Sequence, residues 1–564
     1  MSRVLVAIAL LSLSPPFAIT TGIKVDQAGY LIDAPKAAVV VSESATRFTV
    51  VDSTGIVALR ASLSDPIDDP DSGDRVRVAD FSSLHTAGTF HLVVDGVGES
   101  WAFRIGDDVY RRAYYLAMRS YYGQRCGTAV DLGREFPGYT HGACHRDAAF
   151  HASSGKTGPH PGTRGWHDAG DYGRYVVNSG MTTGTLLWTW ELFSDRIKDI
   201  SLDIPESGDS TPDILDEARW NLDWMLSMQD SDGGVWHKET SEKFAGFVMP
   251  EADSSVSYVI GSGADPFKTT CATADLAAVA AIAARVYRPF DAAYAERTSR
   301  AAAAAWDWAA AHPDVPFRNP PGVVTGEYGD RQCGDERLWA SAELWRTTHD
   351  GKYEHYFVEH ETQFRDTLRP TGPPSWPSVA PLGLWAYAMD RSATTDTAKA
   401  IRNGAAAAAD AIVTRTAAHP YRSSMVRSDF VWGSNAVAAN YGVQLVVANV
   451  IAPKRAYVDT ALDNLHYLLG RNTFSLSWVS AVGANSFQHP HHRPSAADAN
   501  AEPWPGLLSG GPNGRKQDPA MQKLPDLPPA RMYVDDQESY ASNEVAINWN
   551  APLVFLLSGT QRGK

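Results

Sequence analysis

The sequence predicts a small all-β sandwich followed by a large all-α barrel, and two patterns support this fold class. From residue 23 to about residue 106, short runs rich in Val, Thr and Phe are separated by Asp, Gly, Pro and Ser, which is typical of a sandwich. From Tyr110 onward, apolar residues recur at helical spacing in many segments. About a dozen such helices with long loops between them favour an α/α barrel, and no repeat of fixed period indicates a solenoid.

The strands expected in the first region are short and rich in β-branched residues. Residues 75–78 (RVRV) alternate polar and apolar side chains, which is the pattern of a strand with one buried face. The expected strands are residues 37–41, 47–51, 75–78, 88–94 and 100–105.

The clearest helix is expected at residues 213–229, where apolar residues at helical spacing follow Pro212, a favourable first-turn residue. Residues 272–287 and 292–311 are rich in Ala, which has the highest helix propensity. Long loops remain, and loops of that length in a compact domain are usually functional. Further helices are expected at 111–122, 175–192, 335–347, 353–368, 382–389, 394–415, 435–450, 456–469 and 543–557, and the long loops at 124–174 and 471–542.

The composition indicates a folded protein that does not bind nucleic acid. Apolar residues make up 44% and charged residues 20% of the chain, so a packed core is expected and disorder is not. A formal net charge of −15 argues against binding to a phosphate backbone and is compatible with a neutral ligand.

The N-terminus has the pattern of a secretory signal. Arg3 precedes an apolar run from Val4 to Leu13, and small residues follow around Ala18 to Gly22. We therefore expect a signal peptide at residues 1–22 and a secreted protein, extracellular or periplasmic; the alternative is an unstructured start of a cytoplasmic protein. The run is too short to span a bilayer, so no membrane association is expected.

Two carboxylates stand three residues apart in the glycine-rich segment 165–173 (GWHDAGDYG). A turn of this kind directs Asp168 and Asp171 toward one water, so that one takes the proton while the other orients the nucleophile. The alternative is an ordinary turn or a calcium loop, because Asp and Gly favour both.

A second cluster, residues 533–544, leads into an apolar helix. Ser542 or Asn543 is expected to cap that helix, which places Glu544 in its first turn. A glutamate there also complements the helix dipole, but this does not explain the polar and aromatic residues crowded before it. A third cluster ends in His491 and Arg493, whose polar groups suit sugar hydroxyls; a solvated basic loop is the alternative.

These clusters resemble glycoside hydrolase family 9. Residues 477–493 and 533–551 resemble the two sequence signatures of the family, and the turn around Asp171 resembles its catalytic aspartate loop. Residues 23–30 (IKVDQAGY) resemble the opening of the immunoglobulin-like module that precedes the barrel in one branch. The resemblance implies an immunoglobulin-like β-sandwich module at 23–106 and an (α/α)6-barrel catalytic domain at 107–564.

The resemblance implies an inverting endo-β-1,4-glucanase, a cellulase that cleaves β-1,4-glucosidic bonds in cellulose and related β-glucans. Asp171 is then the catalytic base, Asp168 its partner on the water, and Glu544 the acid. The alternative is an exo-acting β-glucosidase or β-glucosaminidase on the same scaffold. Loops that close the non-reducing end of the cleft would distinguish the exo-acting enzyme from the endo-acting one. The intact carboxylates argue against a non-catalytic carbohydrate-binding protein.

The same resemblance implies which residues bind the glucan. His491 and Arg493 match positions that contact the sugar near the cleavage point, and Trp432 resembles a sugar platform. Tyr540 and Trp549 are further candidates, although ordinary packing explains each of the three aromatic residues as well. The expected partner is a β-glucan polysaccharide or oligosaccharide, and the protein is expected to be a monomer.

Two metal sites are expected, and no organic cofactor is expected. Cys126, Cys144, His145 and His167 form a set that suits tetrahedral structural zinc, and they match a zinc site in the branch with the immunoglobulin-like module. Cys271 and Cys333 then remain as free thiols. Asp330, Asp335 and Glu336 resemble a calcium-binding region of the family, but an acidic helix start at Asp335 explains them equally well.

Overall fold

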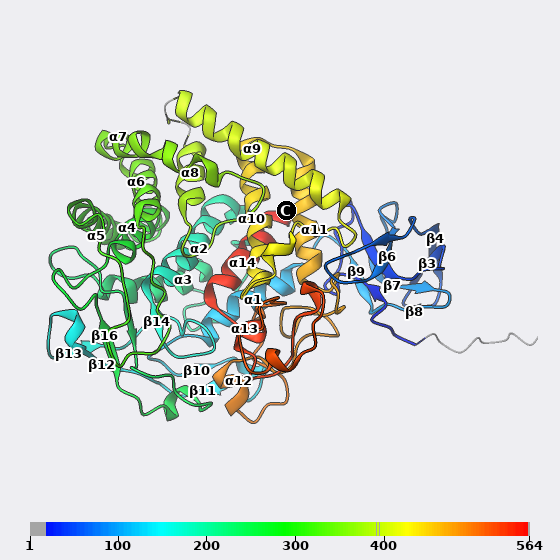
Figure 1. The fold of residues 1–564 in the computed structure, drawn as a ribbon, viewed down its shortest axis with the longest axis horizontal. Helices are drawn as coiled ribbons and strands as arrows, with labels where there is room; N and C mark the ends of the chain where they lie inside the picture. Colours follow the sequence, from blue (N-terminus) through cyan, green and yellow to red (C-terminus); the bar gives the residue numbers. More distant parts are fainter. Residues whose placement is uncertain (1–17, 391, 394, 562–564) are drawn as a thin grey trace, which may run out of the picture.

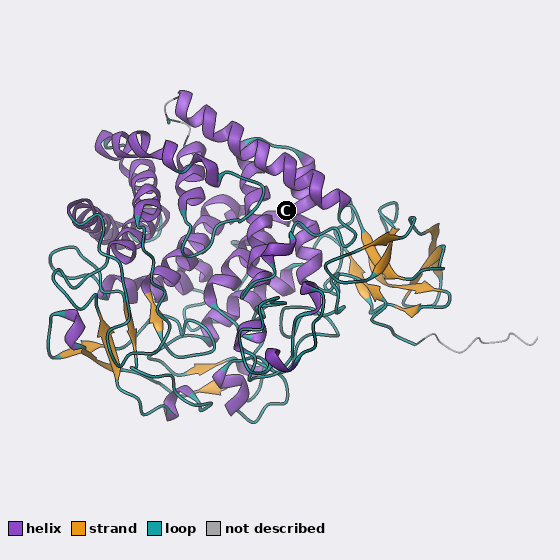
Figure 2. Cartoon of the chain, in the orientation of Figure 1, coloured by secondary structure: helices purple, strands orange, loops and turns teal. Residues whose placement is uncertain are grey.

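The computed structural model describes residues 18–390, 392–393 and 395–561. Residues 1–17 of the expected signal peptide lie outside this range. A β domain lies at one side of a much larger helical domain, as Figures 1 and 2 show. None of the helices in the described part of the chain is long and apolar enough to cross a membrane.

The β domain is a sandwich of two antiparallel sheets, as predicted. One sheet has the order β1-β2-β6-β5 and the other β4-β3-β7-β8, with β9 paired to β7. Alternate side chains point inward, so Phe48, Phe90 and Phe103 form one buried core with residues of the facing sheet. The strands are β1 (Ile23–Lys24), β2 (Ala37–Val41), β3 (Arg47–Asp52), β4 (Val57–Ser62), β5 (Ile67–Asp68), β6 (Arg75–Asp80), β7 (Gly88–Val94), β8 (Gly98–Glu99) and β9 (Phe103–Ile105).

The predicted helices are present, although the helix expected at 353–368 ends at His360, and their contacts form a closed ring. Helices α2, α4, α6, α8, α10 and α14 contact one another in that order, and α14 contacts α2 again. Helices α1, α3, α5, α7, α9 and α11 each pack against a member of the ring. These helices are α1 (Arg111–Gly123), α2 (Val176–Ile197), α3 (Asp213–Ser227), α4 (Thr270–Val286), α5 (Ala292–Ala311), α6 (Gly334–Thr348), α7 (Gly351–His360), α8 (Ala380–Met389), α9 (Thr395–Ala418), α10 (Ser434–Ile451), α11 (Arg455–Leu468) and α14 (Ile547–Thr560).

Burial explains which helices form the ring. Helices α4, α10 and α14 are apolar around most of their circumference and are buried along almost their whole length. Helix α5 instead buries one face and leaves the other in solvent. The small side chains of the alanine-rich α4 allow the neighbouring helices to approach closely. The high helix propensity of alanine and the close packing therefore both favour a helix here.

One predicted helix start is wrong. The last helix was expected from residue 543, but α14 begins at Ile547. Glu544 is extended instead, with φ −71° and ψ 165°, because its segment pairs with two others through the bridges His491–Glu544 and Ser509–Val545. The expected capping by Ser542 or Asn543 is therefore absent, and Glu544 is not in a first helical turn.

The expected loop at 124–174 contains short strands that join a five-stranded sheet with the order β13-β12-β16-β15-β14. Strands of two to four residues are too short for their periodicity to be recognised. The sheet lies at one end of the helices (Figure 2) and carries the segment that leads into the Asp168 turn. Its strands are β12 (Asp147–Phe150), β13 (Pro159–Pro161), β14 (Arg174–Tyr175), β15 (Lys238–Thr240) and β16 (Ser257–Ile260).

The expectation that Cys271 and Cys333 are free thiols is wrong, because they form a disulfide. Cys271 lies in the first turn of α4 and Cys333 directly precedes α6. The contact between these two helices brings the Cα atoms of the cysteines to 4.8 Å across 62 residues of sequence.

The sandwich packs directly onto the helical domain. Asp26 of the sandwich and His466 of α11 are both buried, and Asp26 Oδ2 lies 2.7 Å from His466 Nδ1. The buried Lys24 ammonium donates to the carbonyl of Thr473 at 2.7 Å. These polar groups are removed from water on both sides, so the two domains meet through a specific interface.

Candidate active site

A tight turn between the sheet and α2 positions Asp168 and Asp171. The backbone amide of Asp168 donates to the carbonyl of Gly173 at 2.9 Å, and the amide of Gly173 donates to Asp171 Oδ2 at 3.1 Å. A Cβ atom on Gly170 would lie 2.0 Å from the carbonyl oxygen of His491, so only glycine allows this approach. The turn therefore brings the aspartates against the loop that carries His491.

Asp168 is 1% exposed and is held on both carboxylate oxygens. Asn178 Nδ2 donates to Oδ1 at 2.5 Å, and the Tyr328 hydroxyl donates to Oδ2 at 2.6 Å. Burial, and then the charge of Asp171, raise the pKa of Asp168 to about 8. The carbonyl of Asp168 also accepts the amide of Ile547 at 2.8 Å, which links this turn to the start of α14.

Asp171 lines the main cavity and is 7% exposed. Its Oδ2 accepts the Gly173 amide and the Tyr175 hydroxyl, the latter at 3.0 Å. Within the described part of the chain, no protein group donates a hydrogen bond to its Oδ1. This oxygen is the one that remains available for a water in the cavity.

Glu544 lines the same cavity from the segment between α13 (Tyr540–Asn543) and α14. Burial, and then the charges of Asp171 and Asp168, raise the pKa of Glu544 well above its ordinary value, while Arg493 lowers it. A carboxyl group whose pKa is raised in this way suits a general acid.

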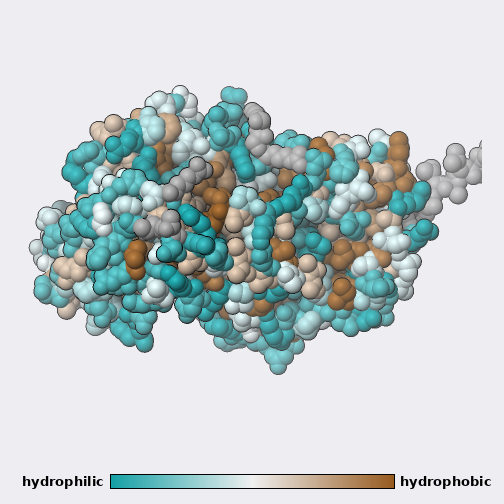
Figure 3. All heavy atoms as spheres, turned by 90° about the horizontal axis from the view of Figure 1, so that it is seen from above, coloured by the Kyte–Doolittle hydropathy of each residue, from teal (hydrophilic) through white to brown (hydrophobic). Residues whose placement is uncertain are grey.

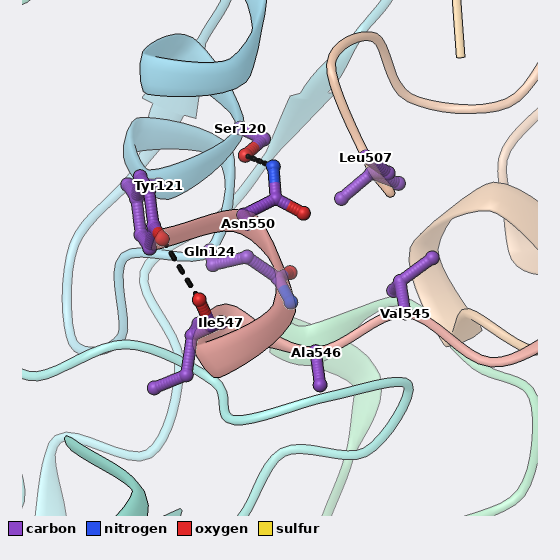
Figure 4. A pocket seen from close by; sticks show the side chains of 8 residues that line it. All are labelled: Ser120, Tyr121, Gln124, Leu507, Val545, Ala546, Ile547 and Asn550. Carbon is purple, nitrogen blue, oxygen red and sulfur yellow. Dashed lines mark hydrogen bonds between the residues drawn. The ribbon is translucent and has the colours of Figure 1, made fainter. Parts of the chain in front are cut away.

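The start of α14 is fixed from behind by α1 (Figure 4). The Tyr121 hydroxyl donates to the carbonyl of Ile547 at 2.8 Å, and Asn550 Nδ2 donates to Ser120 Oγ at 2.9 Å. These side chains surround a cavity of only about 10 Å³, which has no room for a substrate. They hold the segment that carries Glu544 rather than forming a second site.

The main cavity has a volume of about 620 Å³. All residues that the sequence predicted as the catalytic base, the catalytic acid or sugar contacts line this cavity. Asp168 is buried beside it and does not line it. A second cavity of about 350 Å³ shares Trp376, Trp432, Asn548 and Trp549 with the first, so the two form one elongated cleft. The predicted lining residues are Asp171, Glu544, His491, Arg493, Trp432, Tyr540 and Trp549.

The sequence reasoning missed four aromatic residues that line the main cavity: Tyr175, Phe244, Tyr328 and Trp376. Trp376 is the one that a signal in the sequence could have identified, because it stands in a proline-rich loop (PPSWP) where core packing is not expected. Trp432, which was predicted, is 41% exposed, so its ring is open to a ligand rather than packed away.

Cys126, Cys144, His145 and His167 lie together, with one donor atom from each within 4.8 Å of the others. Cys144 Sγ is 3.5 Å from His167 Nε2. His145 Nε2 contacts Asp253 Oδ2 at 3.1 Å, which leaves its buried Nδ1 without a hydrogen-bond partner in the described part of the chain. Two thiols and two imidazoles with an orphaned ring nitrogen fit a bound metal ion.

The second predicted metal site also gathers carboxyl groups, and it includes Asp275, which the sequence did not indicate. Asp335 accepts the amide of Val379 at 2.8 Å, but both carboxylate oxygens of Asp275 and of Glu336 are buried without a hydrogen-bond donor among the described residues. Burial raises the pKa values of Asp275, Asp335 and Glu336, and the charge of Asp330 raises all three further. Uncompensated buried carboxylates of this kind fit either a bound cation or shared protons.

Two neighbouring buried aspartates, a buried glutamate that lines the same cavity as Asp171, and a cleft lined by aromatic rings are typical of a hydrolase of carbohydrates. Comparison with known proteins supports this class of enzyme. Residues 110–557 match the family described as glycosyl hydrolase family 9, and residues 19–99 match the cellulase N-terminal ig-like domain.

Related proteins cover almost the whole chain. Endoglucanase D of Acetivibrio thermocellus is 36% identical over 542 residues, covering 95% of this chain and 83% of that protein. The cellodextrinase of Butyrivibrio fibrisolvens is 37% identical over 552 residues, covering 95% and 98%. A crystal structure of a zinc-binding triple mutant of the family 9 endoglucanase J30 superimposes with a TM-score of 0.86 at 38% identity, covering 95% of this chain and 100% of that one. The chain therefore belongs to glycosyl hydrolase family 9.

Proposed function

We propose that this glycoside hydrolase is an inverting endo-β-1,4-glucanase that cleaves internal bonds of cellulose and related β-glucans. The observation that carries the proposal is the elongated cleft in which Asp171 and Glu544 both face the substrate space, flanked by aromatic rings. The similarity to Endoglucanase D of Acetivibrio thermocellus supports it. The face of the molecule in Figure 3 is mostly hydrophilic, as suits an enzyme that meets its polymer substrate in water.

The chemistry follows from the hydrogen bonds of the carboxyl groups. A water in the cavity attacks the anomeric carbon and gives its proton to Asp171 Oδ1, because Oδ2 is occupied by Tyr175 and Gly173. As the bond from the anomeric carbon to the glycosidic oxygen breaks, Glu544 transfers its proton to that oxygen. The attack opposite the leaving group inverts the anomeric carbon in one step.

Aromatic rings bind the flat faces of the glucose units. The rings of Trp432 and Tyr540 lie 5.4 Å apart and are tilted by 39°, so they form one apolar wall beside Glu544. Arg493 donates to the carbonyls of Gly170 and Ala245, which fixes its guanidinium at the edge of the cleft.

The first product is expected to be the α-anomer of the new reducing end. Water attacks from the side of Asp171 while Glu544 protonates from the other, which requires the roughly 6.5–9.5 Å separation of an inverting pair. ¹H NMR in the first minutes of cellopentaose hydrolysis, before mutarotation, measures the anomer directly. An initial excess of β-anomer would reassign Asp171 as a nucleophile.

A product profile separates the endo from the exo mode. An endo-acting enzyme lowers the viscosity of carboxymethylcellulose before much reducing sugar appears, and it cuts cellohexaose at internal bonds. The exo alternative, which the cellodextrinase relative supports, releases short products from one end and leaves the viscosity almost unchanged.

We also propose that Cys126, Cys144, His145 and His167 bind structural zinc, and we expect about one zinc ion per chain. Cys144→Ser should lose the metal and lower the Tm, because metal binding is coupled to folding. Elemental analysis after purification without chelators, with a thermal melt, measures both effects. The matched control, Cys271→Ser with Cys333→Ser, removes the disulfide and should keep the zinc; a metal-free wild type would contradict the proposal.

Three further proposals concern the rest of the molecule. The closed ring of helices with its outer helices is an (α/α)6 barrel, supported by the order of their contacts. Asp275, Asp330, Asp335 and Glu336 bind calcium, supported by the uncompensated buried oxygens of Asp275, Asp330 and Glu336. The protein is secreted, supported by the pattern of its N-terminus.

A further inference from the structure

A buried lysine lies behind the proposed catalytic base. Strands β14 and β15 pair so that Tyr175 stands directly opposite Lys238, which places their side chains on the same face of the sheet. The Tyr175 hydroxyl donates to Asp171 Oδ2, and Lys238 Nζ lies 5.6 Å from the centroid of the Tyr175 ring. Both residues are buried, Lys238 completely.

The same ammonium also holds the segment that supports the second aspartate. Lys238 Nζ donates to Asn319 Oδ1 at 2.6 Å, to Thr325 Oγ1 at 3.2 Å and to the carbonyl of Gly326 at 2.8 Å. Two residues after Gly326, the Tyr328 hydroxyl donates to Asp168 Oδ2. The rings of Tyr175 and Tyr328 are also in contact, with centroids 4.7 Å apart.

The lysine has no carboxylate within ion-pair distance in the described part of the chain, so its charge is balanced over a longer range. Burial lowers the pKa of Lys238 to about 7, while the charges of Asp171 and Glu327 act in the opposite direction. A buried ammonium that only donates to neutral acceptors is costly for stability, which makes a purely structural role a poor explanation.

We propose that Tyr175 and Lys238 form a positioning pair for the two catalytic aspartates, an inference that rests on the proposed function. Tyr175 occupies Oδ2 of Asp171, so that Oδ1 faces the water in the cavity. Lys238 fixes the ring of Tyr175 on one side and the segment that carries Tyr328 on the other. Neither residue is a catalytic residue in this proposal, since neither transfers a proton in the reaction.

The pair also affects the charge on the base. A hydroxyl that donates to a carboxylate, and a cation beside it, both stabilise the charged form of that carboxylate, and the removal of either takes this stabilisation away. The base is inactive when protonated, and the acid limb of the pH profile of kcat/KM therefore moves to higher pH. The other charged or titratable groups that interact with Asp171 are Asp168, Glu544 and His491.

Tyr175→Phe is expected to lower kcat by about 10- to 100-fold, as for the loss of a hydrogen bond to a charged group, with little change in KM. The acid limb should move to higher pH. Lys238→Met should move that limb in the same direction, and the double variant should lose less activity than the product of the two single losses, because both act through Asp171. Assays on cellopentaose across the pH range measure all three variants.

Two matched controls remove similar groups away from the cleft. Tyr457→Phe removes a hydroxyl that donates to Asp410 at 2.8 Å, and Lys24→Met removes the buried ammonium at the domain interface. Neither should move the acid limb, although both are expected to lower the Tm. If the Lys238→Met variant does not fold, the Tyr175→Phe variant alone tests the proposed positioning pair. Unchanged kcat and acid limb in Tyr175→Phe would overturn the positioning pair, whereas an inactive wild type would contradict the proposed function itself.

Discussion

Asp171→Asn is expected to lower kcat on cello-oligosaccharides by about 10²–10⁴-fold, the usual contribution of a general base. The amide keeps the size of the carboxylate, and its oxygen still accepts the hydrogen bonds of Tyr175 and Gly173. It has no basic oxygen to take the proton of the attacking water. The loss should therefore appear in kcat with KM almost unchanged, because the cleft itself is intact.

Steady-state kinetics and a thermal melt of the same preparation test this expectation. Asp314→Asn, on the exposed surface of the helical domain, is the matched control and should behave as the wild type. An Asp171→Asn variant that retains near-normal kcat would remove this residue from the role of base.

Glu544→Gln is expected to lower kcat by about 10²–10⁴-fold on natural β-glucans, because the leaving oxygen then departs without a proton. The loss should depend on the leaving group. A 2,4-dinitrophenyl β-cellobioside has a leaving group that needs no protonation, so the variant should hydrolyse it at close to the wild-type rate. A comparison of this substrate with cellopentaose separates a missing acid from a damaged cleft.

The pH profile adds a second test of Glu544. The acid must be protonated, and burial together with the charges of Asp171 and Asp168 raises its pKa well above the ordinary value. Activity is therefore present below this raised pKa and is lost as the pH rises through it. Glu544→Gln should abolish that basic limb, whereas the exposed control Glu296→Gln should keep it. A variant with an unaltered basic limb would assign the limb, and the acid, to another group.

The boundaries of long elements were predictable because they depend on local pattern. The alanine-rich segment 292–311 coincides with α5, and the alternating segment 88–94 coincides with β7. In both, a single period of burial extends over many residues and agrees with the intrinsic propensity. The start of α14 at Ile547 was not predictable, since the bridges of the preceding residues with distant segments decide it.

The candidate site was also predictable in its residues but not in its arrangement. Asp171, Glu544 and His491 stand in motifs that resemble those of the family, and the tertiary structure places all three around one cavity. Tyr175 and Lys238 have no such motif. Each is an ordinary residue of a strand too short to recognise, and their relation to Asp171 exists only because β14 pairs with β15.

The sequence by itself determined the order of the two domains, the helices and longer strands, and the residue types needed for acid–base hydrolysis, because each depends on neighbours along the chain. Only the tertiary structure decided that Cys271 pairs with Cys333, that Asp275 joins Asp335 and Glu336, and that Glu544 is extended beside His491. These features depend on groups tens of residues apart in the sequence, and their proximity follows from the packing of helices and loops in the helical domain, which no local pattern encodes.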